Sequence, residues 1–358
     1  MDDTKYQQIA FQLLVLNDPA ARLKFIKSGR RYHDFFAMER RNLKIFGFEE
    51  KNLNKFKKNY KYAAEAEIEK AAKNGVEIIF SDDEHFPELL REIYDPPYYI
   101  YVMGDKKALT GNKLGVVGSR KGSVYGFNAL RSILPDIIFE KITIVSGMAY
   151  GIDAMSHKIA IKEGGKTVGV NAGGLLNLYP SGNAGLINGI KKSGCIISEF
   201  PLDTIPRPFL FPIRNRIIAG LSKAVLVVEA EMRSGSLITA RLAVEQNRDV
   251  FAIPGPVNSS LSTGTNYLIQ QGAKLIRKSS DILTEYGIVN KRIKAVSDIK
   301  LTSSEKKILD LIGENEVKSI NYFVESLGMS VSETITLLMG LVLKNIVSEE
   351  NGGFRKIA

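Results

Sequence analysis

The chain has 358 residues, of which 44% are hydrophobic and 25% are charged, and these proportions are typical of a folded globular protein. No stretch approaches the roughly 20 continuous apolar residues of a membrane span, and a single cysteine, Cys195, excludes an internal disulfide framework. The net charge of +10 makes an acidic polymer a natural partner, although a lysine-rich composition alone gives the same charge.

The first 70 residues contain short helical patterns with basic connectors, which predict a small helical domain. Its acidic start, Met1-Asp2-Asp3, is unlike a signal peptide, so we expect a cytoplasmic protein. From Gly75 onward two strands are predicted, at 76–80 and 98–102, and this block leads into the main domain.

Strand and helix patterns alternate between residues 111 and about 285, which predicts a doubly wound α/β fold with a mostly parallel sheet. The apolar runs do not alternate with polar residues, as expected for strands buried on both faces. Strands are expected at 114–117, 142–145, 167–170, 196–198, 224–228, 250–253 and 274–276. Pro135 is expected to end the first helix of this region early.

Three helical patterns and a hairpin follow Asp298, and together they predict a winged helix. Ser303 or Ser304 is expected to cap the first helix, Ser330 or Ser332 is expected to cap the third, and the hairpin turn is placed at 351–352. The third helix carries few basic residues, so an interaction role is favoured over reading a DNA duplex.

Ligands of open α/β sheets bind beyond the carboxyl ends of the strands, and small or cationic residues follow several predicted strands here. Backbone N–H groups of glycine-rich turns and arginine side chains are suited to phosphate oxygens. Such residues are Gly118, Ser119 and Arg120 after the first strand, Ser146 and Gly147 after the second, and Arg214, Asn215, Arg216 and Arg233 around the fifth.

The segment 211–222 is interpreted as a loop that enters a helix, with Asn215 able to cap that helix or to bind a ligand. Alternatively, Arg214 and Arg216 pair with acids elsewhere in the fold. The sequence has neither a dinucleotide fingerprint nor a Walker A motif, and its histidines lack metal-ligand spacing, so no cofactor or metal is expected.

Three acids near these loops, Asp153, Glu199 and Glu229, either act as an acid or base or hold an arginine in place. His157 is expected to pack or cap within its helix rather than to act as a base. Cys195 is expected to be a buried apolar side chain.

Several of these motifs resemble the DprA (Smf) family of DNA-processing proteins, in order and through about half of the chain. They are VGSR at 117–120, SGMAYGID at 146–153, YPSGN at 179–183, SEFP at 198–201, FPIRNRIIAGLS at 211–222, VVEA at 227–230, RSGSLITARLA at 233–243 and FAIPG at 251–255. The stretch at 83–105 also fits.

The resemblance implies a non-catalytic protein that binds single-stranded DNA, protects incoming strands in natural transformation and loads the RecA recombinase onto them. It also implies three domains: a sterile-alpha-motif-like helical domain at 1–70, an extended Rossmann-like DNA-binding domain at 71–290 and a winged helix at 300–358.

The resemblance assigns Arg120 to the DNA backbone and Phe211 to a stacked base, an interaction that tolerates any sequence. At two positions where members of the family often have a lysine, this chain has Pro208 and Ser181. Arg207, directly before Pro208, is the residue that would substitute for the first of these lysines. The expected DNA-binding set is therefore Gly118, Ser119, Arg120, Ser146, Gly147, Arg207, Phe211, Arg214, Asn215, Arg216 and Arg233.

The segment 266–275 resembles the family's self-association surface, with Asn266, Ile269 and Leu275 as contacts of a homodimer. Alternatively, Ile269 and Leu275 are ordinary core residues. An enzyme of a related fold, a nucleotide phosphoribohydrolase, is the alternative function, but its PGGxGT loop is missing from the corresponding segment at 233–237.

Overall fold

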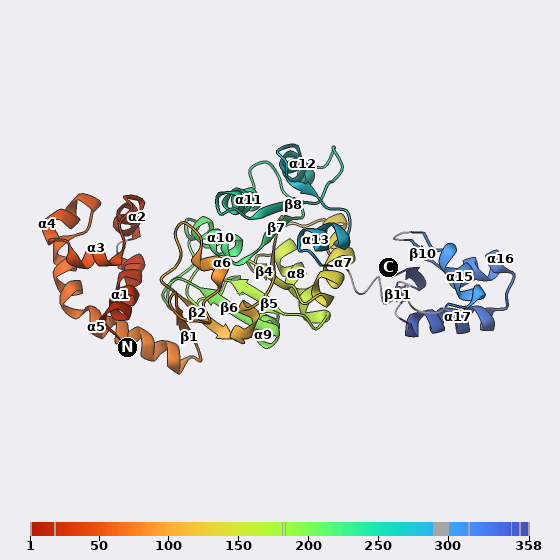
Figure 1. Cartoon of the computed structure of the whole chain (residues 1–358), viewed down its shortest axis with the longest axis horizontal. Helices are drawn as coiled ribbons and strands as arrows, with labels where there is room; N and C mark the ends of the chain where they lie inside the picture. The colour runs from red at the N-terminus through yellow and green to blue at the C-terminus, as the bar shows by residue number, and fades with distance from the viewer. Residues whose placement is uncertain are drawn as a thin grey trace. The chain divides into compact units, whose positions relative to one another are not determined.

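The computed structural model divides the chain into two compact units, Met1–Tyr286 and Gly287–Ala358 (Figure 1). It describes residues 2–17, 19–180, 182, 184–288, 301–313, 316–344, 346–350 and 352–356. The predicted boundary near residue 70 therefore falls inside the first unit, in which a set of helices and a large sheet are joined.

The first part of this unit is helical, as predicted. Its helices are α1 (Asp3–Asn17), α2 (Pro19–Lys27), α3 (Tyr32–Ala37), α4 (Arg40–Leu43) and α5 (Glu50–Lys73). They enclose a core of aromatic side chains, among them Phe11, Phe25 and Phe35, whose rings meet mostly edge to face.

A sheet of nine strands forms the centre of the unit, in the order β1-β2-β6-β5-β4-β3-β7-β8-β9. The strands are β1 (Glu77–Phe80), β2 (Tyr99–Gly104), β3 (Lys113–Val117), β4 (Thr143–Ser146), β5 (Thr167–Val170), β6 (Gly194–Ser198), β7 (Ala224–Val227), β8 (Asp249–Ala252) and β9 (Lys274–Leu275). The strands from β6 to β9 in this order are parallel, whereas β1 and β2 add to the β6 edge in antiparallel pairing. The seven strands predicted between 111 and 285 are all present, and the predicted α/β fold is confirmed.

The strand order reverses between β3 and β7, so the sheet is doubly wound. Right-handed crossovers that run in opposite directions place their helices on opposite faces of a sheet. One set is α7 (Val124–Phe139), α8 (Ile152–Lys162) and α9 (Ala184–Ser193), and the other is α10 (Leu210–Leu221), α11 (Gly235–Glu245) and α12 (Thr263–Gln270). Two further helices, α6 (Glu88–Arg91) and α13 (Ser279–Glu285), pack against α10 and α7 respectively.

Helix α7 continues through Pro135 to Phe139, so the expectation that this proline ends the helix early is wrong. An interior proline costs a helix about 3 kcal/mol. The residues on both sides of it, Ile133, Leu134, Ile137 and Ile138, are all buried, and their packing outweighs that cost.

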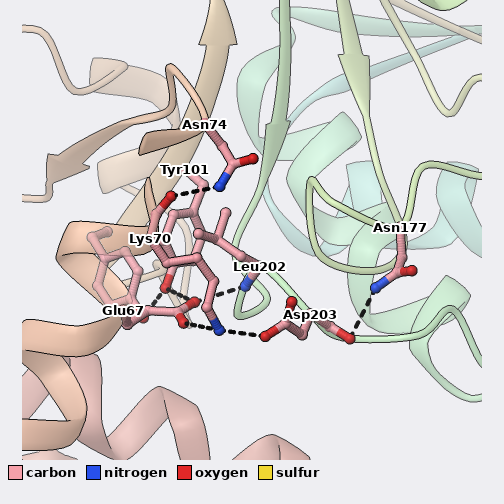
Figure 2. Close-up of polar contacts among 8 residues, drawn as sticks. Glu67, Lys70, Asn74, Tyr101, Asn177, Leu202 and Asp203 are labelled. Carbon is pink, nitrogen blue, oxygen red and sulfur yellow. Dashed lines mark hydrogen bonds and ion pairs between the residues drawn. The ribbon is translucent and has the colours of Figure 1, made fainter. Parts of the chain in front are cut away.

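The helical part is joined to the sheet by shared apolar packing and by a buried polar network. Ala64 and Ala71 of α5 pack in one cluster with Tyr99 and Tyr101 of β2. The buried carboxylate of Glu67 accepts hydrogen bonds from the Tyr101 hydroxyl at 3.0 Å and the Leu202 N–H at 2.7 Å (Figure 2).

The same network includes an ion pair outside the buried carboxylate. Lys70 lies 3.7 Å from Glu67 and pairs with Asp203, whose carbonyl accepts a hydrogen bond from the Asn177 side chain at 3.0 Å (Figure 2). Helix α5 is thus bonded to the connection between β6 and α10, which leads to the predicted binding residues.

Within its described residues, the second unit has three helices and a small antiparallel sheet in the order β10-β12-β11. Its elements are α15 (Ser303–Asp310), β10 (Val317–Lys318), α16 (Ile320–Leu327), α17 (Val331–Leu343), β11 (Val347–Glu350) and β12 (Gly353–Lys356). These are the predicted helices and hairpin, and the winged helix itself stays a prediction.

Two local predictions in this unit have different outcomes. Thr302 caps α15 through a hydroxyl that accepts the Glu305 N–H, so the expected caps Ser303 and Ser304 are wrong. Ser330 caps α17 and accepts the Glu333 N–H, as one of the two alternatives predicted. The predicted hairpin turn includes position 351, which lies outside the described residues.

Among the described helices, none alone is long and apolar enough to cross a membrane, although the pair α16 and α17, bent by 115°, meets that test together.

Candidate nucleic-acid interface

A cavity of about 670 Å³ lies at the carboxyl ends of β3 and β7, where the strand order reverses. This is the position at which doubly wound sheets bind their ligands. Residues of the β3–α7 loop, the first half of α10 and the start of α11 line it. They include Gly118, Ser119, Arg120, Phe211, Arg214, Asn215, Ser234 and Gly235.

The β3–α7 loop is fixed against the start of α8. The Ser119 N–H donates to the Glu229 carbonyl at 2.8 Å, and the Ile152 N–H donates to the Ser119 carbonyl at 3.1 Å. A Cβ at Gly118 would lie 2.7 Å from Cγ1 of Ile152, so the close approach of loop and helix requires a glycine. The loop therefore presents the exposed Arg120 side chain at the cavity from a fixed backbone.

Two rings and two guanidinium groups meet at the first turn of α10. The Phe211 ring lies 5.4 Å from Cζ of Arg120 and 5.7 Å from Cζ of Arg214, both within cation–π range. The ring of Tyr179 meets it nearly edge-on, with centroids 5.6 Å apart, and this tyrosine is 40% exposed. The cluster offers cationic groups and aromatic surface together.

Tyr179 was missed as a site residue by sequence reasoning. Its position directly before Pro180, in a loop after a predicted strand, was the available signal.

Arg214 is a buried residue in the wall of the cavity. Its guanidinium donates to the carbonyls of Gly147, at 2.8 Å, and Val170. It also interacts electrostatically with the buried carboxylate of Asp153, which accepts the Gly147 N–H at 3.2 Å. A Cβ at Gly147 would lie 2.7 Å from Nη2 of Arg214, which explains the glycine.

Burial sets the ionisation of this group of residues. It raises the pKa of Asp153 to about 6, against the opposing effect of Arg214, and lowers the pKa of Arg214 to about 10. Burial also lowers the pKa of His157 to about 3, and its Nδ1 lies 2.7 Å from the Thr167 hydroxyl. His157 is thus a neutral packing residue, as expected.

Asn215 lines the cavity, as its predicted ligand-binding role requires, but its capping role and the predicted position of Arg216 at this cavity are wrong. Both are inside α10, so Asn215 does not cap a helix, and its Oδ1 instead accepts a hydrogen bond from Nε of Arg214 at 3.1 Å. Side chains two residues apart on a helix point about 200° apart, which directs Arg216 away from the cavity that Arg214 lines.

Arg216 pairs with Asp95, at 3.1 Å between Nε and Oδ2, and with Glu199. Arg216 thus pairs with acids, as one of the two alternatives predicted, and does not line this cavity with Arg120 and Arg214.

The other predicted residues lie outside the cavity lining. Ser146 is buried and donates to the Val116 carbonyl at 2.6 Å, while Arg207 and Arg233 are exposed on neighbouring segments. Ser181, aligned with a family lysine, lies outside the described residues.

Each of the three candidate acids is engaged in structural contacts. Glu199 pairs with Arg216, and Asp153 interacts with Arg214. The buried carboxylate of Glu229 accepts the Ser123 N–H at 2.8 Å and the Ser123 hydroxyl at the start of α7. This use of Glu229 in structural contacts disfavours the acid or base role that was one alternative for it.

The predicted self-association residues lie at one edge of the sheet. Asn266 of α12 bonds within the chain, accepting the Gly255 N–H at 3.2 Å and donating to the Gly255 carbonyl at 3.0 Å. Ile269 is half-buried and Leu275, on the edge strand β9, is 39% exposed. Leu275 is thus not a fully buried core residue.

The fold and the cavity define a doubly wound α/β protein whose ligand cavity, with arginine and aromatic side chains, lies at the topological switch point. Residues 77–287 match the family model described as DNA recombination-mediator protein A. The chain belongs to this family, and the resemblance seen in its motifs is confirmed.

Curated relatives and solved structures agree with this assignment. Protein Smf of Escherichia coli is 37% identical over 289 residues, covering 78% of this chain and 77% of that protein. DNA processing protein DprA of Bacillus subtilis is 43% identical over 212 residues, covering 59% of this chain and 71% of that protein.

Among solved structures, DprA of Streptococcus pneumoniae has a TM-score of 0.66 at 36% identity, covering 80% of this chain and 99% of the other. DNA processing protein A of Helicobacter pylori, described for its single-stranded DNA binding mode, has a TM-score of 0.54 at 29% identity, covering 59% and 95%.

Proposed function

We propose that this protein binds single-stranded DNA without sequence preference at the switch-point cavity, as a non-catalytic recombination mediator. The observation that carries the proposal is the pair of Arg120 and Phe211 in the cavity lining, with Tyr179 packed against the Phe211 ring. Arginine binds backbone phosphates whatever the base, and an aromatic face accepts any base by stacking. Family membership and the single-strand binding described for the Helicobacter pylori relative support it.

In this proposal the protein protects incoming single strands in the cytoplasm and loads the RecA recombinase onto them. The support for this finer role is the family described as a recombination mediator and the expectations drawn from its motifs. The second unit, as a winged helix with an acidic residue, Glu333, in its third helix, serves as an interaction module rather than a duplex reader.

We further propose a homodimer that forms through the β9 edge. Leu275 and the neighbouring Tyr267, which is 41% exposed, supply apolar surface beside an edge strand. A two-fold dimer would place two cavities on one strand, and avidity would then raise the affinity without any new kind of contact.

The test is fluorescence anisotropy with labelled oligothymidine at two salt concentrations. Arg120→Ala should weaken binding about tenfold for all sequences alike and reduce the salt slope by about 1, because one phosphate contact is lost. Phe211→Ala should remove roughly 1–3 kcal/mol for one stacked base.

Arg131→Ala is the matched control, because Arg131 is an exposed arginine on α7 that bonds only locally to Asn128 and does not line the cavity. Equal affinity of the unmodified protein for a long duplex, or no effect of Arg120→Ala, would refute the proposal.

A further inference from the structure

A second cavity, of about 400 Å³, lies on the other side of α10 from the first, between that helix, the helical part of the unit and the loop at 94–98. Arginine side chains are concentrated in its lining. They are Arg22 of α2, Arg30 and Arg31 of the following connection, and Arg216 of α10.

Helix α10 separates the two cavities, and they adjoin at its first turn. Phe211 and Arg214 line the switch-point cavity, Ile213 and Arg216 line the second, and Pro212 lines both. A chain bound at Phe211 therefore needs to pass only Pro212 to reach the second cavity.

The second cavity has an excess of positive charge. Its two carboxylates, Asp95 and Glu199, both pair with Arg216. No carboxylate in the described part of the chain lies within ion-pair distance of Arg22, Arg30 or Arg31. Three guanidinium groups thus remain for an anionic ligand.

Arg22 is held in a fixed position although no carboxylate among the described residues forms an ion pair with it, and Glu199 attracts it only at longer range. It donates to the side chain of Gln12, which in turn donates to the Glu199 carbonyl at 2.8 Å, and its Cζ lies 5.3 Å from the Phe11 ring. Its buried Nε has no hydrogen-bond partner among the described residues.

Burial lowers the pKa of Arg22, which shows that its charge is poorly solvated. A half-buried cation whose opposing charge, on Glu199, is shared with Arg216 is costly, and a bound phosphate would offset that cost.

Aromatic surface accompanies these arginines, as it does in the first cavity. Tyr94 lines the second cavity and is 91% exposed, while the hydroxyl of the half-buried Tyr98 accepts the Tyr32 N–H at 3.3 Å. Cationic groups interleaved with an exposed aromatic ring are the combination with which proteins bind single strands.

We propose that a single strand leaving the switch-point cavity continues past Pro212 into this second cavity, where Arg22, Arg30 and Arg31 bind its phosphates and Tyr94 stacks on a base. The inference rests on the proposed function, because it extends the same strand. It assigns a DNA-binding role to the helical part of the first unit, which lies outside the segment that matches the family model.

The test compares a short and a long oligothymidine, of about 6 and about 20 nucleotides, since single-strand sites cover roughly 4–16 nucleotides. The combined change Arg30→Ala with Arg31→Ala should weaken binding of the long strand at least tenfold, as expected for lost charge-assisted hydrogen bonds, and leave the short strand unaffected. Arg120→Ala should weaken both. Arg40→Ala, which removes an exposed charge from α4 outside the cavity, is the matched control.

Photo-crosslinking of the unmodified protein gives a readout that a change in stability cannot produce. A long strand carrying a photoreactive thymidine analogue at successive positions should crosslink to Tyr94 as well as to the segment around Phe211. Crosslinks confined to the switch-point cavity, or equal affinity of the double variant for the long strand, would overturn the inference and leave the proposed function intact. An unmodified protein that binds neither strand would refute the proposed function itself.

Discussion

The most informative perturbation of the fold is the removal of the buried carboxylate that joins α5 to the β6–α10 connection. In Glu67→Ala, the buried Leu202 N–H loses its acceptor and the Tyr101 hydroxyl keeps only the Tyr99 hydroxyl, at 3.3 Å. An unsatisfied buried donor costs about 1–3 kcal/mol, so the free energy of unfolding should fall by about 1–3 kcal/mol through the Leu202 N–H alone. Urea denaturation, monitored by intrinsic tyrosine fluorescence, measures this change in the free energy of unfolding.

Two further variants test whether the loss of stability comes from the buried hydrogen bonds of Glu67. Glu67→Gln keeps an acceptor oxygen and should cost less than Glu67→Ala. Glu69→Ala, two residues along the same helix, removes only an exposed i,i+4 pair with Lys73 and should cost roughly 0.3–0.5 kcal/mol. If Glu67→Ala costs no more than Glu69→Ala, the network does not hold the helical part to the sheet, and this reasoning is refuted.

The remaining predictions concern association and the cysteine. If the proposed homodimer forms, Leu275→Asp should shift it to monomer in size-exclusion chromatography, because a charge would be buried at the β9 edge, whereas Val244→Asp, at a 66% exposed valine of α11, should not. Cys195 is fully buried and burial raises the pKa of its thiol to about 12, so thiol reagents should not label the native protein between pH 7 and pH 9 but should label it once it is unfolded. Labelling of the native protein at pH 8 would contradict the burial of this strand.

The sheet could be predicted because short continuous apolar runs such as 224–228 are typical of strands that are buried on both faces of a parallel sheet. The same logic located Gly118 and Arg120, since the end of the first parallel strand is a fixed position in a doubly wound fold. Pro135 misled the prediction because its intrinsic cost was visible in the sequence and the burial of its neighbours was not.

The arrangement of the arginines could not be predicted in the same way. Arg214 and Arg216 are two positions apart in the sequence. Their side chains are known to point in different directions only once 210–221 is known to be helical from its start. The second cavity depends on how α2 docks beside α10, a tertiary contact that leaves no local signal at Arg22 or Arg31.

The shared packing of α5 and β2 also bears on how the protein can be divided for experiments. The family match begins at residue 77, which invites a shortened chain that starts there. Such a chain would lose Ile9, Ala64 and Ala71, and the side chains of Tyr99 and Tyr101 that they cover on β2 would become exposed to water. Exposed aromatic surface of this kind promotes aggregation, so a fragment intended to isolate the portion with the switch-point cavity should retain the helices that precede it.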